Sequence, residues 1–216
     1  MEKIILDLCG GAGAWSKPYT KNGYNVKVLT LPDNDISDWT NGDMPKIAEL
    51  IQDNKIYGIL AAPPCTEFSI ARNDKTAKNP RDLREGMRLI NACMYIIQEC
   101  LYSPYRKSEN RLKFWALENP YSGYLKRFIG EPPLVFNPCD YGDPYTKKTA
   151  IWGMFNEPKK NPVKAERGTM VKHANHFKDI KPVDEEYRKK LGIDARTIRR
   201  SITPEGFANA FYKANQ

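Results

Sequence analysis

The sequence predicts an α/β fold in which helices cover a mainly parallel β-sheet. Short apolar runs at 3–9, 25–31, 57–62 and 113–118 have the length and composition of buried strands. Over 44–52 and 82–102, apolar residues recur at three- and four-residue steps, which is typical of helices with one buried face. Strands and helices therefore alternate along the chain, and this alternation favours a parallel sheet covered on both faces.

Turn-forming residues mark where the predicted elements end. The first strand breaks into the glycine-rich stretch GGAGAW, Pro32 ends the second, Pro63-Pro64 end the third and Asn119-Pro120 end the fourth. Two shorter strands are expected at 134–137 and 149–152. A terminal helix is expected within 201–216, with Ser201 or Thr203 as its N-cap and Pro204 in its first turn.

Composition narrows the class of protein. The chain has 216 residues, of which 41% are hydrophobic and 28% charged, enough for one folded domain with a small appended lobe. No apolar run approaches the roughly 20 residues that span a bilayer, and no signal peptide is visible. We therefore expect a cytoplasmic protein with no membrane partner.

The net charge of +8 favours a polyanionic partner such as nucleic acid, although a basic surface can also serve solubility alone. Basic residues gather at 159–172 and 188–200. The five cysteines are odd in number and form no C-x-x-C pair, so we expect neither a disulfide framework nor a metal site.

Three motifs follow predicted strands, at the sheet edge where α/β proteins bind ligands. In DLCGGAGAW, the glycines permit a tight turn that can approach a nucleotide-like cofactor, although a plain strand-to-helix turn explains this motif better when it is taken alone. In AAPPCTEFS, two prolines rigidly present Cys65, which is either a nucleophile or a small buried residue. In WALENP, Glu118 is either a proton donor or a surface carboxylate.

The order and spacing of these motifs resemble the cytosine-C5 methyltransferase family. DLCGGAGAW resembles the family's cofactor motif, with Cys9 in place of an aromatic residue, and PPCTEFS resembles its nucleophile motif. ENP resembles its Glu-Asn-Val motif, and DYGDPYTKKTAIWG at 140–153 resembles a further conserved segment. RSITPEGFANAF at 200–211 is similar to the family's last motif only faintly.

The resemblance implies a Rossmann-like class I methyltransferase that uses S-adenosyl-L-methionine to methylate cytosine C5, in double-stranded DNA. It assigns Cys65 as the nucleophile that adds to C6 and Glu118 as the acid that contacts the base. The implied cofactor contacts are Asp7, Gly10, Gly11, Gly13, Trp15, Asp35, Ile36 and Pro63. The implied substrate contacts are Ser69, Asn119 and Lys147. Nearby positive charge or backbone donors are expected to lower the pKa of Cys65.

The same resemblance divides the chain into a catalytic domain at 1–152, a reduced target-recognition segment at 153–200 and a helix at 201–216 that packs back on the catalytic domain. The short recognition segment is a departure from the family and suits a compact, monomeric enzyme of a bacterium or a phage-infected cell. The sequence departs from the family pattern in two further respects. Tyr145, Lys147 and Thr149 stand where the family has Gln, Arg and Arg. No acidic residue ends the second strand, so Asp35 or Asp33 is expected to replace it. The alternatives are methylation of RNA or a free nucleotide, and a catalytically silent nucleic-acid-binding protein.

Overall fold

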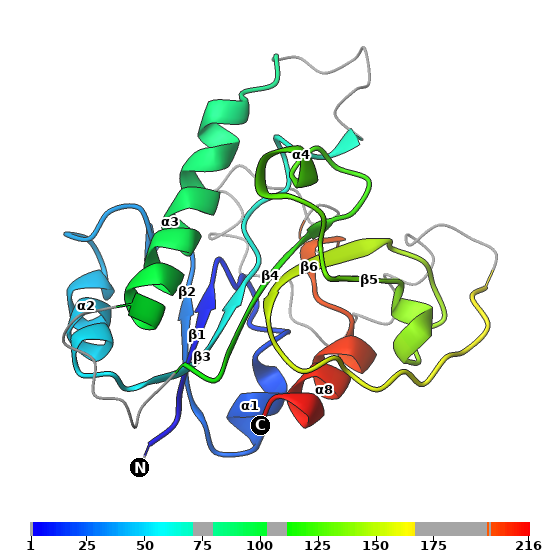
Figure 1. Ribbon diagram of the computed structural model, residues 1–216, viewed down its shortest axis with the longest axis horizontal. Helices are drawn as coiled ribbons and strands as arrows, with labels where there is room; N and C mark the ends of the chain where they lie inside the picture. The colour runs from blue at the N-terminus through cyan, green and yellow to red at the C-terminus, as the bar shows by residue number, and fades with distance from the viewer. Residues whose placement is uncertain (1, 71–79, 103–111, 167–197, 199) are drawn as a thin grey trace.

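The computed structural model describes residues 2–70, 80–102, 112–166, 198 and 200–216. A central sheet lies between two layers of helices (Figure 1). Helices α2 (Met44–Gln52) and α3 (Leu83–Tyr102) cover one face. Helices α1 (Lys17–Lys21) and α8 (Glu205–Ala214) cover the other. Two short elements, helix α4 (Lys126–Ile129) and 3-10 helix η2 (Pro138–Tyr141), follow the fourth and fifth strands.

Within the described residues, the sheet has the strand order β2-β1-β3-β4-β6-β5. Strand β1 pairs in parallel with β2 and β3, and β3 pairs in parallel with β4. Strand β6 runs antiparallel to both β4 and β5. The strands are β1 (Ile4–Leu8), β2 (Asn25–Leu29), β3 (Ile56–Ala61), β4 (Phe114–Pro120), β5 (Leu134–Phe136) and β6 (Thr149–Met154). The predicted Rossmann-like α/β class with a mainly parallel sheet is confirmed.

The strand sequences are continuous apolar runs because both faces of the sheet are buried. Successive side chains of a strand point to opposite faces. In β1, Leu6 and Leu8 pack with the α2 and α3 cluster, whereas Ile5 packs with the cluster that includes α8. Both faces are buried, so neither face of the strand can be polar without a partner. Strand β1 is accordingly buried along its whole length.

Most predicted elements agree with the structure to within two residues, and β4 runs two residues past its predicted end. Asn119-Pro120 was expected to end the fourth strand, whereas β4 continues through Pro120, which pairs with Thr149 of β6. The pairing of β4 with β3 stops at Leu117, so the last three residues of β4 have a strand neighbour on one side only. A proline, which lacks an N–H, is tolerated at such an edge position.

The C-terminal helix begins later than the sequence indicates. The N-cap residue of α8 is Pro204 and not Ser201 or Thr203. Pro204 makes no side-chain hydrogen bond to the helix. The cap comes from a distant segment instead, because Asp143 Oδ2 accepts a hydrogen bond of 2.9 Å from the backbone N–H of Gly206. A carboxylate is favourable there because it meets the positive end of the helix dipole.

The C-terminal end of α8 is hydrogen-bonded to Asn156, which follows β6. The Asn215 side chain accepts a 2.8 Å hydrogen bond from Asn156 N–H and donates a 3.0 Å bond to Asn156 carbonyl oxygen. We call this reciprocal pair the Asn156–Asn215 clasp. Asn156 Nδ2 also donates to the carbonyl oxygen of Ala214 at 2.9 Å. The clasp thus connects the last helix to the chain just beyond the sheet.

Most of the predicted target-recognition segment lies outside the described residues. Of 153–200, the structure describes 153–166, 198 and 200, so the three-part division of the chain stays a prediction. His173 and His176 also lie outside the described residues. In the described ranges, no helix has both the length and the apolar character needed to cross a bilayer.

Candidate active site

The sheet topology places a ligand crevice between β1 and β3. The chain passes from β1 to β2 on one side and to β3 on the other, so the strand order reverses at β1. In open α/β sheets, ligands bind outside the carboxyl ends of the strands at such a switch point. The two carboxyl ends are joined there, because Ala62 N–H donates a 2.9 Å hydrogen bond to Leu8 carbonyl oxygen. The glycine turn and the Cys65 segment begin directly after this junction.

The turn after β1 uses its glycines for two different reasons. Gly11 and Gly13 have φ of 54° and 65°, in the left-handed region that glycine adopts without strain. A Cβ on Gly11 would meet nothing within 4 Å, so this side of the turn is open to a ligand. A Cβ on Gly10 would overlap the Asp7 carboxylate. Gly10 is therefore required for the chain to pass over Asp7.

Asp7 is a buried carboxyl with one unsatisfied oxygen. Its side chain lies on the sheet with 1% exposure, and Ser16 Oγ donates a 2.5 Å hydrogen bond to Oδ2. Oδ1 has no hydrogen-bond partner. Burial raises the pKa of Asp7 to about 7, although the bonds from Ser16 act in the opposite direction. An unpaired carboxylate oxygen beneath an open glycine turn can accept a hydrogen bond from a cationic or amine-bearing ligand.

Replacing Asp7 with asparagine is expected to flatten the pH dependence of stability between pH 5 and pH 8. The folded-state pKa of about 7 lies above the unfolded value of 3.8, so the folded protein binds more protons in this window and its stability falls as pH rises. The asparagine variant lacks this loss, which amounts to about 2 kcal/mol. Urea unfolding at both pH values measures the difference. Parallel pH profiles for the two proteins would contradict the assignment.

The Cys65 segment is fixed by backbone hydrogen bonds from two sides. Within the segment, the N–H groups of Phe68 and Ser69 donate to Cys65 carbonyl oxygen at 3.0 and 2.8 Å. Before it, the fully buried Asn119 donates from Nδ2 to Pro63 carbonyl oxygen at 3.1 Å. Strand β4 therefore holds the backbone that leads into Cys65. Asn119 Oδ1 has no hydrogen-bond partner and is a second unsatisfied acceptor in this region.

Arg81, which the sequence did not indicate, holds the C-terminal end of the same segment by hydrogen bonds. Arg81 donates to the carbonyl oxygens of Glu67 and of Ser69, the latter at 3.0 Å. Asp82 N–H donates to Glu67 Oε2 at 2.7 Å. The carbonyl of Ser69, a predicted substrate contact, is thus engaged with Arg81. No local sequence signal indicates these contacts, because they join residues more than ten positions apart.

The structure brings Cys65 and Glu118, the predicted catalytic residues, together with Lys147, a predicted substrate contact. Cys65 is partly buried, and Lys147 Nζ lies 3.8 Å from Glu118 Oε1, with these two side chains only 15% and 13% exposed. The expected lowering of the Cys65 pKa is wrong for the substrate-free protein. Burial raises the pKa of the thiol and the Glu118 carboxylate raises it further, while Lys147 and Arg200 oppose them. Desolvation of the thiolate outweighs the nearby positive charge.

Arg200 is a second residue that sequence reasoning missed. Its charge acts on Cys65 although 135 positions separate the two in the sequence. The signal available was its place at the start of RSITPEGFANAF, the faint terminal motif. The C-terminal segment therefore contributes to the electrostatics of the site in addition to packing on α1.

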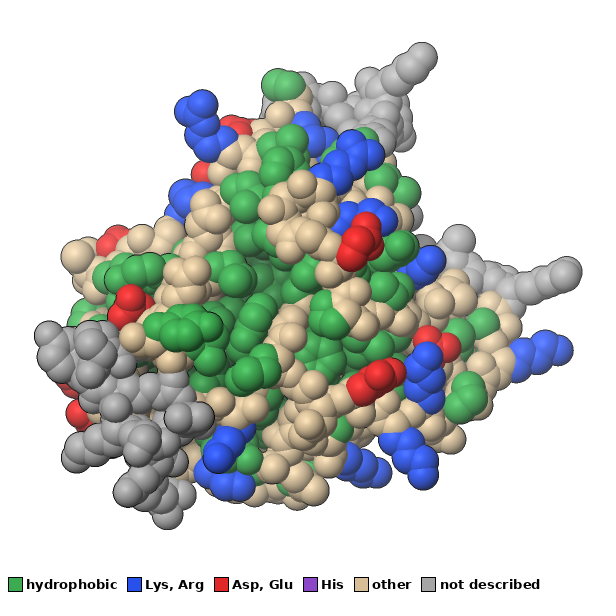
Figure 2. Space-filling view, viewed as in Figure 1, with side chains coloured by type: hydrophobic (Ala, Val, Ile, Leu, Met, Phe, Trp, Pro, Cys, Tyr) green, Lys and Arg blue, Asp and Glu red, His purple; other side chains and the backbone are tan. Residues whose placement is uncertain are grey.

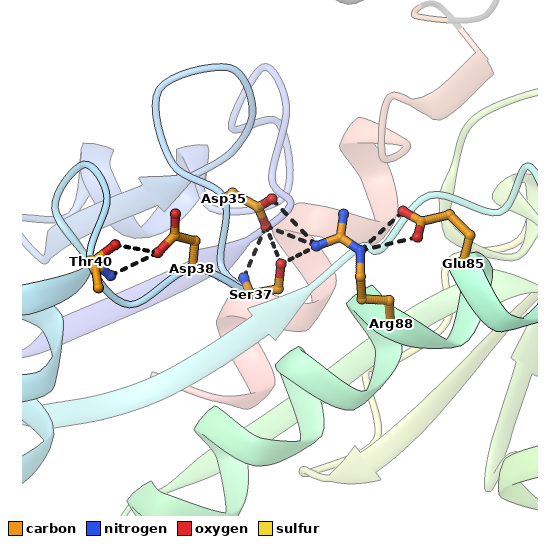
Figure 3. Close-up of polar contacts among 6 residues, drawn as sticks. All are labelled: Asp35, Ser37, Asp38, Thr40, Glu85 and Arg88. Carbon is orange, nitrogen blue, oxygen red and sulfur yellow. Dashed lines mark hydrogen bonds and ion pairs between the residues drawn. The ribbon is translucent and has the colours of Figure 1, made fainter.

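Asp35 lies in a network of polar contacts that joins the segment after β2 to α3 (Figure 3). Its Oδ1 accepts hydrogen bonds from Ser37 N–H at 3.0 Å and from Ser37 Oγ at 2.6 Å. Arg88 reaches from α3 to Asp35 Oδ2 at 3.4 Å and to Ser37 Oγ, while Glu85 holds its Nε at 3.0 Å. Partial burial acts to raise the pKa of Asp35, but Ser37 and Arg88 outweigh it and lower the pKa.

This network fixes the backbone around Asp35 and Ile36, two of the predicted cofactor contacts. Ile36, next to Asp35, is 2% exposed and belongs to the α2 and α3 core cluster. Arg88 had no distinguishing sequence signal, since it is one of several charged residues on α3. Figure 2 shows a hollow in this face of the molecule, lined largely by hydrophobic side chains, between α3 and strands β4 and β6.

Trp15 occupies a different environment from the other predicted cofactor residues. Its ring is 2% exposed and packs against Phe207 and Phe211 of α8, with ring centroids 6.0 and 5.4 Å apart. Trp15 is therefore part of the core between α1 and α8. Pro63, another predicted cofactor contact, is buried at the junction with Asn119.

The fold is thus a Rossmann-like α/β arrangement compatible with a methyltransferase, with polar and nucleophilic groups gathered at the switch point. The chain is 24% identical over 173 residues to Type II methyltransferase M.DdeI of Desulfomicrobium norvegicum. The match covers 68% of this chain and 39% of that protein, so the chain spans about two fifths of the length of the relative. No family model matches the chain.

Proposed function

We propose that the chain is an S-adenosylmethionine-dependent methyltransferase that methylates carbon 5 of cytosine in DNA through a covalent bond between Cys65 and carbon 6. The observation that carries this proposal is the gathering of Cys65, Glu118 and Lys147 at the carboxyl ends of β3 and β4, beside the open glycine turn. The distant similarity to a type II methyltransferase supports the methyltransferase class and DNA as the substrate.

The residues at the glycine turn suit the cofactor. The unpaired Asp7 Oδ1 offers an acceptor for its ammonium group, and the open side of Gly11 leaves room for close backbone approach. Asp35 lies on the segment after β2 along the same edge, where it would meet the adenosine part of the cofactor. Ile36 is buried in the core beside it and would hold this segment in place. S-adenosylmethionine, when bound, supplies the methyl group that carbon 5 receives.

The proposed chemistry begins at the thiol of Cys65. The thiolate adds to carbon 6, a sulfur–carbon bond forms, and the electron pair of the C5–C6 double bond becomes available at carbon 5. Protonated Glu118 hydrogen-bonds to N3, and Lys147 adds a positive charge that stabilises the electron density developing on the ring. After carbon 5 is methylated, loss of its proton to a base restores the double bond and expels Cys65.

The raised pKa of Cys65 implies that substrate binding helps to generate the thiolate. In the substrate-free protein, Glu118 raises the pKa of the thiol and Lys147 lowers it. Engagement of Glu118 with the base as a neutral acid removes a negative charge from beside the sulfur. Lys147 and Arg200 then lower the pKa of Cys65 without opposition from Glu118, and this favours the thiolate. In a duplex, carbon 6 is reached only when the cytosine is flipped out of the stack.

The protein is expected to form a stable covalent complex with DNA that contains 5-fluorocytosine. Fluorine at carbon 5 cannot leave as a proton, so the adduct with Cys65 persists after methyl transfer. Denaturing gel electrophoresis of protein incubated with labelled DNA and S-adenosylmethionine detects the complex, and mass spectrometry locates it on the Cys65 peptide. Turnover on ordinary cytosine with no trapped species would contradict the proposed covalent mechanism.

The choice of polymer is tested by comparing methyl incorporation into duplex DNA, RNA and dCMP under the same conditions. The positive charge of the chain favours a polymer, because phosphate contacts supply most non-specific affinity. Within the proposal, residues 1–152 form the catalytic domain and 153–200 contact the target sequence. Incorporation into RNA or dCMP alone would replace DNA as the substrate while retaining the chemistry at Cys65.

A further inference from the structure

Basic side chains lie over two tyrosine rings near the ends of β4 and β6. Tyr121, Tyr124, Lys126 and Arg127 follow β4, and Lys148 directly precedes β6. Lys126 Nζ and Lys148 Nζ lie 4.1 and 4.5 Å from the ring centroid of Tyr121. Arg127 Cζ lies 4.7 Å from the ring centroid of Tyr124. We call these five residues the basic–tyrosine patch. Arg81, which also ties the Cys65 segment, lies over the Tyr124 ring at 4.8 Å. Figure 2 shows Lys and Arg side chains gathered around α4 on this face of the molecule.

The patch carries more positive charge than the described residues around it compensate. Among the described residues, the carboxylate that pairs with Lys126, Arg127 or Lys148 is Glu131, whose Oε1 lies 3.6 Å from Lys126 and whose side chain is 71% exposed. The tyrosine rings stabilise cations above them, but only partly offset the repulsion between two ammonium groups that share one ring. A cluster of this kind attracts anions from solution.

The patch adjoins the candidate active site on two sides. Lys148 follows Lys147, the partner of Glu118, and its carbonyl oxygen accepts a 3.1 Å hydrogen bond from Tyr121 N–H. On the other side, Tyr124 N–H donates to Phe68 carbonyl oxygen at 2.9 Å, within the Cys65 segment. An anion bound at the patch is therefore next to whatever occupies the site.

We infer that the basic–tyrosine patch binds backbone phosphates of the DNA strand beside the target cytosine. This inference rests on the proposed function for the identity of the polymer. The cations lie over the rings, so the tyrosines hold cations in place and are not free to stack on bases. Contacts of this kind position a nucleic acid without reading its sequence. The patch thus fixes the register of the strand while other residues select the site.

The test is the salt dependence of duplex binding by Lys126→Gln/Lys148→Gln, measured by fluorescence anisotropy without cofactor. Loss of two phosphate contacts is expected to reduce the slope of log Kd against log salt by about 2 and to raise Kd roughly tenfold or more at 0.1 M salt. The effect should be equal for duplexes of unrelated sequence. The matched control is Lys21→Gln/Lys27→Gln, which removes two exposed lysines from α1 and β2, away from α4 in Figure 1.

Two further variants separate the role of the rings from a loss of folding. Tyr121→Phe keeps an aromatic ring under Lys126 and Lys148 and is expected to bind DNA as the parent protein does. Tyr121→Leu removes the ring and is expected to weaken binding by a few-fold while thermal unfolding of both variants stays similar. Equal binding by the two would contradict the arrangement.

Failure of this inference is distinguishable from failure of the proposed function. If the parent protein methylates DNA but the lysine variant keeps the parent slope and Kd, the patch does not contact phosphates and the inference is overturned. If the slope falls as expected but no cytosine is methylated, the patch binds DNA and the proposed function fails. A loss of affinity for RNA with none for duplex DNA also overturns the inference.

Discussion

Cys65→Ala is expected to reduce methyl transfer to DNA by about three orders of magnitude or more, because Cys65 is the residue that we propose forms the bond to carbon 6. Binding of S-adenosylmethionine should persist, since the proposed cofactor contacts other than Pro63 lie on β1, on the turn after it and on the segment after β2. Transfer of a tritiated methyl group measures the first effect and isothermal titration calorimetry the second.

The matched control for this variant is Cys139→Ala. Cys139 is also a partly exposed free cysteine, but it lies in η2 and its backbone pairs with Tyr145 and Val163. The control should methylate DNA at the parent rate. Full turnover by Cys65→Ala would exclude the nucleophile assignment, and loss of cofactor heat in that variant would point to a structural role for the cysteine.

Glu118→Gln is expected to lower kcat by about two to four orders of magnitude, because glutamine keeps the shape of the side chain but cannot supply a proton to N3. The variant also removes the negative charge that raises the pKa of Cys65. The thiol of the substrate-free variant should therefore react faster with iodoacetamide near pH 8. Quantitative mass spectrometry of the Cys65 peptide measures this rate independently of activity.

Lys147→Gln is expected to change the alkylation rate of Cys65 in the opposite direction to Glu118→Gln. Lys147 lowers the pKa of Cys65, so its removal should slow alkylation of the thiol while Glu118→Gln accelerates it. The control Asp53→Asn removes a carboxylate from an exposed ion pair with Lys55 at the C-terminal end of α2 and should change neither rate. If Glu118→Gln and Lys147→Gln shift alkylation in the same direction, general loosening of the site explains both results.

Long apolar segments could be predicted from the sequence because their burial on a sheet determines their composition. Strand β1 and helix α3 agree with the predicted ranges for this reason, and the prolines before Cys65 correctly indicated the end of β3. Short elements such as α4 could not be predicted, because four residues carry no periodic signal. The continuation of β4 through Pro120 depends on pairing with β6, which lies almost thirty residues away.

The site could be predicted in its residue types but not in its electrostatics. The Cys65 and Glu118 motifs indicated neighbouring strand ends, and the structure places both side chains there beside Lys147. The direction of the Cys65 pKa shift was missed because it depends on how completely the folded chain removes water from the sulfur. Arg88 and Arg200 were missed because long side chains reach the site from distant segments.

The Asn156–Asn215 clasp has a consequence for how this scaffold can vary. Together with the Asp143 cap of α8, it anchors both ends of the stretch that separates β6 from the last helix. The entropy of closing a loop grows only with the logarithm of its length, so doubling that stretch costs about 0.6 kcal/mol. Segments of different length can therefore separate these two anchors with little penalty to the stability of the sheet.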